Sequence, residues 1–236
     1  MSQKPIAKQT ISVAHTDQRE NEQICKLLIN EGYNIHAITS AKELMSLMHH
    51  KTTAELPDLM LLSIDIPETN GPSLIRGLRK CFDYPIVILS ENHVEKTIVD
   101  SLDAGAYDFL TLPFGSAEHF ARIRAALRNS GVRMSTGSMY NCGGLSIDFS
   151  SRKVNVRGKD VNLTPIEFRI LTLLARNTGK VLTHEQIINE IWGPLNSDTL
   201  VLRVNMANIR RKLETNPATP EFVLTEMGVG YRMAVL

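Results

Sequence analysis

The hydrophobic residues in the first half of the chain alternate between short runs and helical stretches. Each run is a continuous apolar segment, such as LMLL at residues 59–62, and a stretch whose apolar residues recur every three or four positions follows it. Continuous apolar strands are typical of a parallel sheet with helices on both faces. We therefore predict an α/β domain with a doubly wound, five-stranded parallel sheet. The predicted strands and helices alternate at residues 11–15, 21–30, 33–39, 41–49, 59–63, 72–81, 85–90, 94–104, 106–114 and 118–128.

The second half begins with a different pattern. The segments LSIDFSS and KVNVRGKDVNLT contain short stretches of alternating apolar and polar residues, which predict a small antiparallel sheet. A helix follows, because Thr164 is a hydroxyl N-cap, Pro165 suits the first helical position, and Glu167 completes a capping box. Gly179 is the expected C-cap residue of this helix.

Two further helices and a hairpin complete the second half. Thr183 and Gln186 repeat the capping box for a helix that runs to about Trp192. A third helix is predicted over residues 199–214, and residues 222–233 form two strands around a glycine-containing turn. A sheet, three helices and a terminal hairpin predict an α+β winged helix-turn-helix domain.

The two halves are separated by a segment without apolar periodicity. Residues 129–141, NSGVRMSTGSMYN, are rich in Ser, Gly and Asn, which is typical of a linker. We therefore predict one domain over residues 1–128 and another over 142–236. The first 130 residues carry 13 Lys/Arg and 16 Asp/Glu, whereas the rest carry 13 and 9. This asymmetry favours nucleic acid as a partner of the second half.

The third predicted helix has one apolar face and one polar, cationic face. At 100° per residue its core stripe consists of Leu202, Met206, Ile209 and Leu213. The opposite face suits the DNA major groove, because small central side chains can meet base edges while flanking cations reach phosphates. The alternative is a solvated basic helix face. The candidate DNA-facing residues are Leu200, Arg203, Val204, Asn205, Ala207, Asn208, Arg210, Arg211 and Lys212.

Composition excludes several classes of protein. A hydrophobic fraction of 43% and a charged fraction of 22% are typical of a globular protein, and no apolar run reaches the length of a membrane span. The N-terminal residues lack the apolar core of a secretory signal. Cys25, Cys81 and Cys142 are widely spaced, so we expect free thiols, no metal and no cofactor. These features predict a cytoplasmic protein that has no membrane partner.

Candidate chemistry in the first half lies where the predicted strands end. The carboxyl ends of parallel strands meet at one edge of the sheet, which is where such folds place their functional crevice. The residues expected to converge there are His15, Thr16, Asp17, Ser63, Ser90 and Leu112.

Three stretches of the second half, LTPIEFRILTLLARNTGKVLTHEQIINEIWG, VNMANIRRKLE and TEMGVGYR, resemble the OmpR/PhoB family of bacterial response regulators. The resemblance extends over nearly the whole chain and is strongest to the KdpE type. It implies a flavodoxin-like receiver domain and a DNA-binding transcriptional regulator whose third helix enters the major groove while the wing reaches the adjacent backbone or minor groove. The contacts it implies are Arg203, Asn205, Asn208, Arg210, Arg211 and, in the wing, Thr225. Met227 stands where many members have an Arg.

The first half resembles a receiver but departs from it at the phosphorylation site. The resemblance implies two adjacent Mg²⁺-binding acids, an acceptor Asp and a Lys, where this chain has His15 and Thr16, Ser63, and Leu112. An acyl phosphate requires a carboxylate nucleophile, Mg²⁺ prefers carboxylate oxygens, and the transferred group needs a cation. The sequence therefore predicts an atypical receiver that does not take phosphate from a histidine kinase.

Three other chemical roles for this edge fit the sequence less well, and a fourth stays open. Asp65 as a displaced acceptor lies in a loop and still lacks the Lys and the acid pair. A triad of Ser63, His15 and Asp17 lacks the G-x-S-x-G turn of a hydrolase, and the same His15 and Asp17 with Asp65 form too loose a cluster for a metal. Phosphorylation of Ser63 by a serine/threonine kinase stays open. The favoured interpretation is that Ser63 only ends a buried strand.

Dimerisation is the remaining role expected of the receiver. Asp108, Glu118 and Arg122 match charged positions on the face through which the family pairs symmetrically, although solvated surface charge is the alternative. We therefore expect a non-enzymatic regulator that binds double-stranded promoter DNA as a homodimer without Asp phosphorylation, with RNA polymerase as a further partner. The alternative function is a receiver crevice that senses a small molecule, a partner protein or Ser/Thr phosphorylation and so controls DNA binding.

Overall fold

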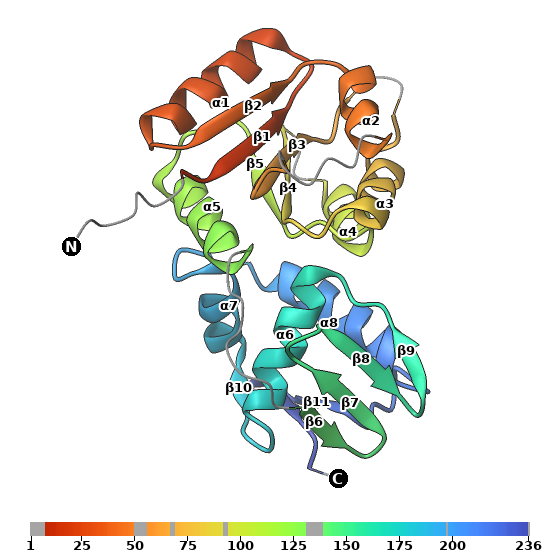
Figure 1. Ribbon diagram of the computed structural model, residues 1–236. Helices are drawn as coiled ribbons and strands as arrows, with labels where there is room; N and C mark the ends of the chain where they lie inside the picture. Colours follow the sequence, from red (N-terminus) through yellow and green to blue (C-terminus); the bar gives the residue numbers. More distant parts are fainter. Residues whose placement is uncertain are drawn as a thin grey trace, which may run out of the picture. The chain divides into compact units, whose positions relative to one another are not determined.

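The chain divides into two compact units, Met1–Gly131 and Val132–Leu236. The structure is a computed structural model (Figure 1), and it describes residues 8–49, 56–66, 69–91, 94–130, 139–196 and 198–235.

The first unit is built on a five-stranded sheet in the order β2-β1-β3-β4-β5. All neighbouring strands are parallel. The strands are β1 (Thr10–Ala14), β2 (Asn34–Ile38), β3 (Leu59–Ser63), β4 (Ile86–Ser90) and β5 (Asp108–Thr111). In this topology the strand order reverses between β1 and β3, which is the switch point where doubly wound sheets place a functional crevice.

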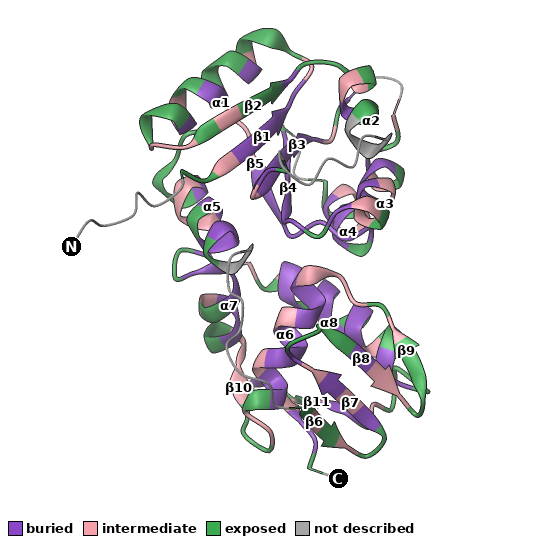
Figure 2. Cartoon of the chain, in the orientation of Figure 1, coloured by how far each residue is buried: buried purple, intermediate pink, exposed green. Residues whose placement is uncertain are grey.

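Within the described residues, five helices cover the two faces of this sheet. They are α1 (Gln18–Asn30), α2 (Ala41–His49), α3 (Gly71–Cys81), α4 (Glu95–Asp103) and α5 (Ala117–Ser130). Figure 1 shows α1 and α5 on one face and α2, α3 and α4 on the other. Every residue of β3 and β4 is buried (Figure 2), because both faces of these central strands are covered. The predicted doubly wound α/β domain is therefore confirmed.

In the part of the second unit that the structure describes, two small sheets combine with three helices. The four-stranded sheet is antiparallel and contains β6 (Met139–Cys142), β7 (Leu145–Asp148), β8 (Lys153–Val156) and β9 (Lys159–Val161). The three-stranded sheet has the order β10-β12-β11 and contains β10 (Leu182–Thr183), β11 (Val223–Glu226) and β12 (Gly230–Met233). The helices are α6 (Pro165–Arg176), α7 (His184–Trp192) and α8 (Thr199–Leu213). This arrangement confirms the winged helix-turn-helix prediction, with the β11–β12 hairpin as the wing.

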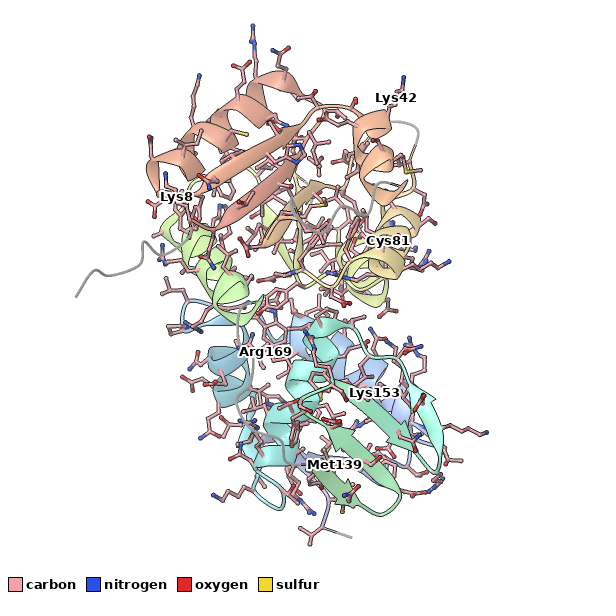
Figure 3. All side chains as sticks on the ribbon, in the orientation of Figure 1. Lys8, Lys42, Cys81, Met139, Lys153 and Arg169 are labelled. Atoms are coloured by element: carbon pink, nitrogen blue, oxygen red, sulfur yellow. The ribbon has the colours of Figure 1, made fainter. Side chains whose placement is uncertain are left out.

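Both predicted capping boxes are present. Thr164 and Glu167 cap each other's backbone at the start of α6, and Thr183 and Gln186 do the same for α7. A guanidinium also satisfies the other end of α7, because Arg169 of α6 (Figure 3) donates to two of its last carbonyl oxygens at 2.8 and 2.9 Å. The sequence-derived caps therefore define where the helix-turn-helix begins, and tertiary contacts define where α7 ends.

The end of α6 differs from the prediction. Gly179 was expected as its C-cap residue, but α6 ends at Arg176 and Asn177 is the C-cap. The Asn177 N–H closes the last turn on carbonyl oxygens of the helix, so the chain leaves α6 before Gly179. Gly179 instead has φ +78° and donates its N–H to the Met233 carbonyl oxygen at 3.1 Å, so it joins this turn to the end of β12.

The linker prediction over 129–141 overlaps elements on both sides. Helix α5 continues to Ser130, and β6 begins at Met139 because its residues pair with β7. The part between them, residues 131–138, lies outside the described residues.

Candidate DNA-binding surface and receiver edge

The core face of α8 is the apolar stripe expected from its sequence. The side chains of this stripe are between 0% and 3% exposed, and they are Leu202, Met206, Ile209 and Leu213. Helix α8 packs through it against α6 and α7. The opposite side of α8 is therefore the side that a helix-turn-helix offers to DNA.

Exposed cations remain on that side. Arg203, Arg211 and Lys212 are exposed, and so is the small Ala207 between the two arginines. Arg203 makes no hydrogen bond or ion pair with any residue that the structure describes, so its charge is available for a phosphate or a base edge. Arg211 donates to the Asn208 Oδ1 at 2.8 Å and keeps further donors.

Three residues predicted to contact DNA are buried. Val204, Asn205 and Asn208 are 9%, 1% and 2% exposed. The Asn205 side chain bonds to its own helix instead of projecting from it, because its Nδ2 donates to the Val201 carbonyl oxygen at 2.8 Å. The surface of α8 that is exposed to a ligand therefore contains fewer of the predicted contact residues than the sequence suggested.

Two further predicted contacts, Arg210 and Thr225, bind each other. Nη2 of Arg210 donates to the Thr225 hydroxyl at 2.6 Å, and Nε donates to the Val223 carbonyl oxygen at 2.9 Å. The same guanidinium carbon lies 5.6 Å from the centroid of the Tyr231 ring. Burial lowers the pKa of Arg210, although the nearby Tyr231 and Glu214 oppose this effect. The arginine thus joins α8 to both strands of the wing.

Lys212 is tied to the start of α6. Its Nζ lies 2.5 Å from Oε2 of Glu167, a carboxylate whose side chain is 3% exposed and which also accepts the Thr164 N–H of the capping box. A lysine paired with a buried carboxylate holds α8 against α6 and offers less charge to DNA.

The wing ends in an apolar turn. Met227 is 88% exposed and Val229 is 47% exposed, while Gly228 between them has φ +73°, a backbone conformation that favours glycine. The tip of the wing is therefore apolar rather than cationic.

The predicted receiver residues lie at one edge of the sheet. Ala14 pairs with Leu62, so His15 and Ser63 follow on adjacent strands. Ser90 pairs with Thr111 at the same ends of β4 and β5, and Leu112 comes next. Ser63 and Ser90 are buried, at 4% and 2% exposed, and Leu112 is half-buried.

The polar groups at this edge are held by neighbours within the chain. His15 is 7% exposed, its Nε2 lies 2.9 Å from Oε2 of Glu20, and its Nδ1 accepts the Asp17 N–H at 3.2 Å. Asp17 itself caps α1 by accepting the Glu20 N–H, while Thr16 is half-buried. The Ser63 hydroxyl accepts the N–H of the exposed Asp65 at 3.4 Å. No group of three or more potential metal-binding side chains occurs within the described parts of the chain.

The three predicted dimerisation residues form one ion cluster inside the chain. Arg122 lies 3.2 Å from Oδ1 of Asp108 and 2.6 Å from Oε1 of Glu118. The side chains of Arg122 and Asp108 are 10% and 1% exposed, whereas Glu118 is 48% exposed. Burial alone would lower the pKa of Arg122, but the two carboxylates outweigh it and raise the pKa above its usual value.

Comparison with known proteins decides the family. Residues 11–124 match the response regulator receiver domain, and residues 158–233 match the family described as transcriptional regulatory protein, C terminal. The KDP operon transcriptional regulatory protein KdpE of Escherichia coli K12 is 40% identical over 177 residues, covering 75% of this chain and 79% of that protein. The transcriptional regulatory protein KdpE of Mycobacterium tuberculosis CDC 1551 is 38% identical over 204 residues, covering 85% and 88%. The chain belongs to the OmpR/PhoB-type response regulators.

Membership of this family fixes the general function. OmpR/PhoB-type response regulators are DNA-binding transcription regulators of two-component systems and not enzymes, and their C-terminal domain binds DNA. A solved structure of a RitR mutant shares the fold, with a TM-score of 0.74 and 21% identity over 96% of this chain and 99% of that one. In the described segments no helix is long and apolar enough to span a membrane.

Sequence reasoning missed the partners that hold several site residues of this response regulator. The contact between Glu20 and His15 could have been predicted from the sequence, because Glu20 lies on the first turn of the helix that follows His15. No pattern in the sequence indicates that Arg210 contacts Tyr231 and Val223, because these two residues lie in separate strands of the wing.

Proposed function

We propose that this response regulator binds promoter DNA as a dimer without phosphorylation of an aspartate in its receiver. The observation that carries the proposal is the residue at the end of β3, where the buried Ser63 offers a hydroxyl instead of a carboxylate. A serine cannot form an acyl phosphate, and the apolar Leu112 at the end of β5 supplies no cation for a transferred phosphoryl group.

The neighbouring residues support the same proposal. His15 occupies the end of β1, and its two ring nitrogens are engaged by Glu20 and the Asp17 N–H. An imidazole held in this way is a poor ligand for Mg²⁺, which prefers several oxygen ligands. Loss of the nucleophile, the acid pair and the cation at one site argues against phosphate transfer from a histidine kinase.

Dimerisation through the receiver is supported by the charged face of β5 and α5. Glu118 is the exposed member of the ion cluster, so its carboxylate can also meet a cation of a second copy. We infer that the receiver of this chain pairs through this face, that the dimer recruits RNA polymerase at promoters, and that it acts in the cytoplasm.

The alternative function is control of DNA binding through a ligand, a partner or Ser/Thr phosphorylation at the receiver edge. Phosphorylation of Ser63 is disfavoured by its burial, because a protein kinase requires an accessible hydroxyl. No contact among the described residues favours a particular small molecule, so this function is not adopted.

Phosphorylation is tested by incubating the full chain with acetyl phosphate and Mg²⁺ and measuring its intact mass. We expect no phosphoryl adduct and the same affinity for DNA with and without the phosphodonor. A receiver that carries Asp at the end of its third strand is the positive control. An acyl phosphate on this chain, or DNA binding that depends on the phosphodonor, would refute the proposal.

Dimerisation is tested by sedimentation of the unmodified chain. We expect a dimer, and we expect Arg122→Glu to weaken both dimerisation and DNA binding. Because Arg122 is buried, Glu118→Lys is the matched variant that changes an exposed charge on the same face. A monomer that still binds its operator tightly would sink this part of the proposal.

A further inference from the structure

We propose that Arg210 is a positioning residue, which fixes the wing relative to α8 and does not itself contact the bases or phosphates of DNA. The proposal concerns a position at which the sequence pattern alone favours a direct DNA contact. It goes beyond phosphorylation independence, because it concerns only the winged-helix unit and is tested without the receiver's chemistry.

The geometry of Arg210 points to the wing. Its Nε donates to the Val223 carbonyl oxygen at 2.9 Å, and its Nη2 donates to the Thr225 hydroxyl at 2.6 Å. One planar guanidinium group therefore forms hydrogen bonds with two residues of β11. The ring of Tyr231 on β12 lies against the same guanidinium. One side chain from α8 therefore contacts both strands of the hairpin.

The chemical nature of these partners supports a structural role. The acceptors are neutral oxygens, and within the described part of the chain no carboxylate forms a hydrogen bond or ion pair with Arg210. The guanidinium is half-buried, where a hydrogen bond to a charged donor is stronger than in water. Losing Arg210 would leave the wing without this support from α8.

A direct contact with a DNA phosphate is the competing interpretation. Arg210 also borders an open hollow of about 350 Å³, which Thr225 and Arg232 line as well. Arg232 is paired there with Glu226 across the wing, which reduces the net positive charge of the hollow. The two interpretations differ in the number of phosphate charges that Arg210 neutralises, which is one for the competing interpretation and none for ours.

The salt dependence of DNA binding separates them. The probe is a labelled duplex enriched from random DNA on the wild-type full chain, and the affinity is measured by anisotropy across a salt series. We expect Arg210→Ala to weaken binding roughly ten-fold with an unchanged slope of log K against log salt. Arg203→Ala, the exposed control on the same helix, is expected to reduce that slope by about 0.9. A similar reduction for Arg210→Ala would overturn the proposal.

A second variant separates charge from shape. Arg210→Lys keeps the charge but replaces the planar fork with a single ammonium group, which cannot donate in the same way to Val223 and Thr225. We expect Arg210→Lys to bind DNA about as weakly as Arg210→Ala. Near wild-type affinity for Arg210→Lys would show that only the charge matters and would overturn the proposal.

The partner hydroxyl supplies a control that does not depend on the arginine. Thr225→Val removes the acceptor, and Thr225→Ser keeps it and should restore binding. If Arg210 acts through the wing, the double variant Arg210→Ala/Thr225→Val binds no more weakly than Arg210→Ala alone. Fully additive losses would contradict the proposal, and unchanged amide spectra outside the hairpin would show that each variant is folded.

Discussion

The guanidinium of Arg210 on α8 donates a hydrogen bond to the hydroxyl of Thr225 on β11, 2.6 Å away. These two residues belong to the two parts of the domain that we expect to contact DNA, helix α8 and the wing. Because of this contact, a change in the position of either part should shift the position of the other. Arg210 is half-buried, whereas Arg203 and Arg211 of the same helix are exposed.

The apolar tip of the wing predicts weak electrostatic binding by the hairpin. Met227→Arg adds a cation at a position that is 88% exposed, so we expect tighter DNA binding at low salt and a salt slope that is steeper by about 0.9. Met139→Arg is the matched control, because Met139 is also exposed but lies on β6 of the other sheet (Figure 3). An equal gain from both variants would show that added charge acts without regard to position.

Restoring the acceptor carboxylate alone should not restore phosphorylation. Ser63→Asp is expected to give no acyl phosphate with acetyl phosphate and Mg²⁺, because His15 and Leu112 still supply neither an acid pair nor a cation. The new carboxyl group replaces a buried side chain, so we also expect the free energy of unfolding to fall by about 2 kcal/mol. Intact-mass spectrometry and denaturant unfolding check the two expectations, with Ser63→Ala as the control.

The ion cluster on β5 and α5 should contribute unequally to stability. Arg122→Leu removes the cation beside Asp108, whose side chain is 1% exposed, and we expect a loss of about 3 kcal/mol in the free energy of unfolding. Glu118→Gln changes a carboxylate that is 48% exposed, so its cost should stay below about 1 kcal/mol. Equal costs in denaturant unfolding would show that the buried pair is not the dominant contact.

Acidification should destabilise the first unit through His119. Burial lowers the pKa of His119 below 6.5, and its Nδ1 accepts the Gly115 N–H at 3.2 Å, which requires an unprotonated nitrogen. The unfolded chain therefore binds the proton more readily, so this stabilisation is complete above about pH 6.5 and is lost as the pH falls through the lower folded pKa. His119→Gln should reduce the pH dependence of thermal unfolding below about pH 6.5. The same pH dependence in His119→Gln and in the wild type would contradict the prediction.

The parts of the fold that local chemistry determines could be predicted from the sequence. Continuous apolar runs identified the five parallel strands, and two capping boxes located the starts of α6 and α7. The apolar stripe of α8 identified its core face, because a stripe of this kind leaves only one way to bury the helix. Strand β10 was missed, because the two residues Leu182 and Thr183 are too few to show a period.

The contacts of the candidate site were harder to predict, because several of its side chains bind residues that are distant in the sequence. An asparagine that bonds back to its own helix, as Asn205 does, has the same place in a helical pattern as one that reads a base. Arg210 meets Thr225 only after the hairpin has folded against α8. The residues at the receiver edge could be identified from the sequence, whereas the contact between Glu20 and His15 is known only from the structure.

Strand β10 has a consequence for the DNA that this protein can bind. Thr183 is both the last residue of β10, where it pairs with Gly230 of the wing, and the N-cap of α7. The pairing depends on glycine, since a Cβ at Gly230 would overlap the Leu182 carbonyl oxygen. This pairing holds the helix-turn-helix and the wing at a fixed separation. In the DNA, one inserted base pair rotates the flanking segments by roughly a tenth of a revolution relative to each other. If α8 and the wing both contact DNA, as we predict, we expect an operator for this protein to keep the helical phase between the two contacted segments.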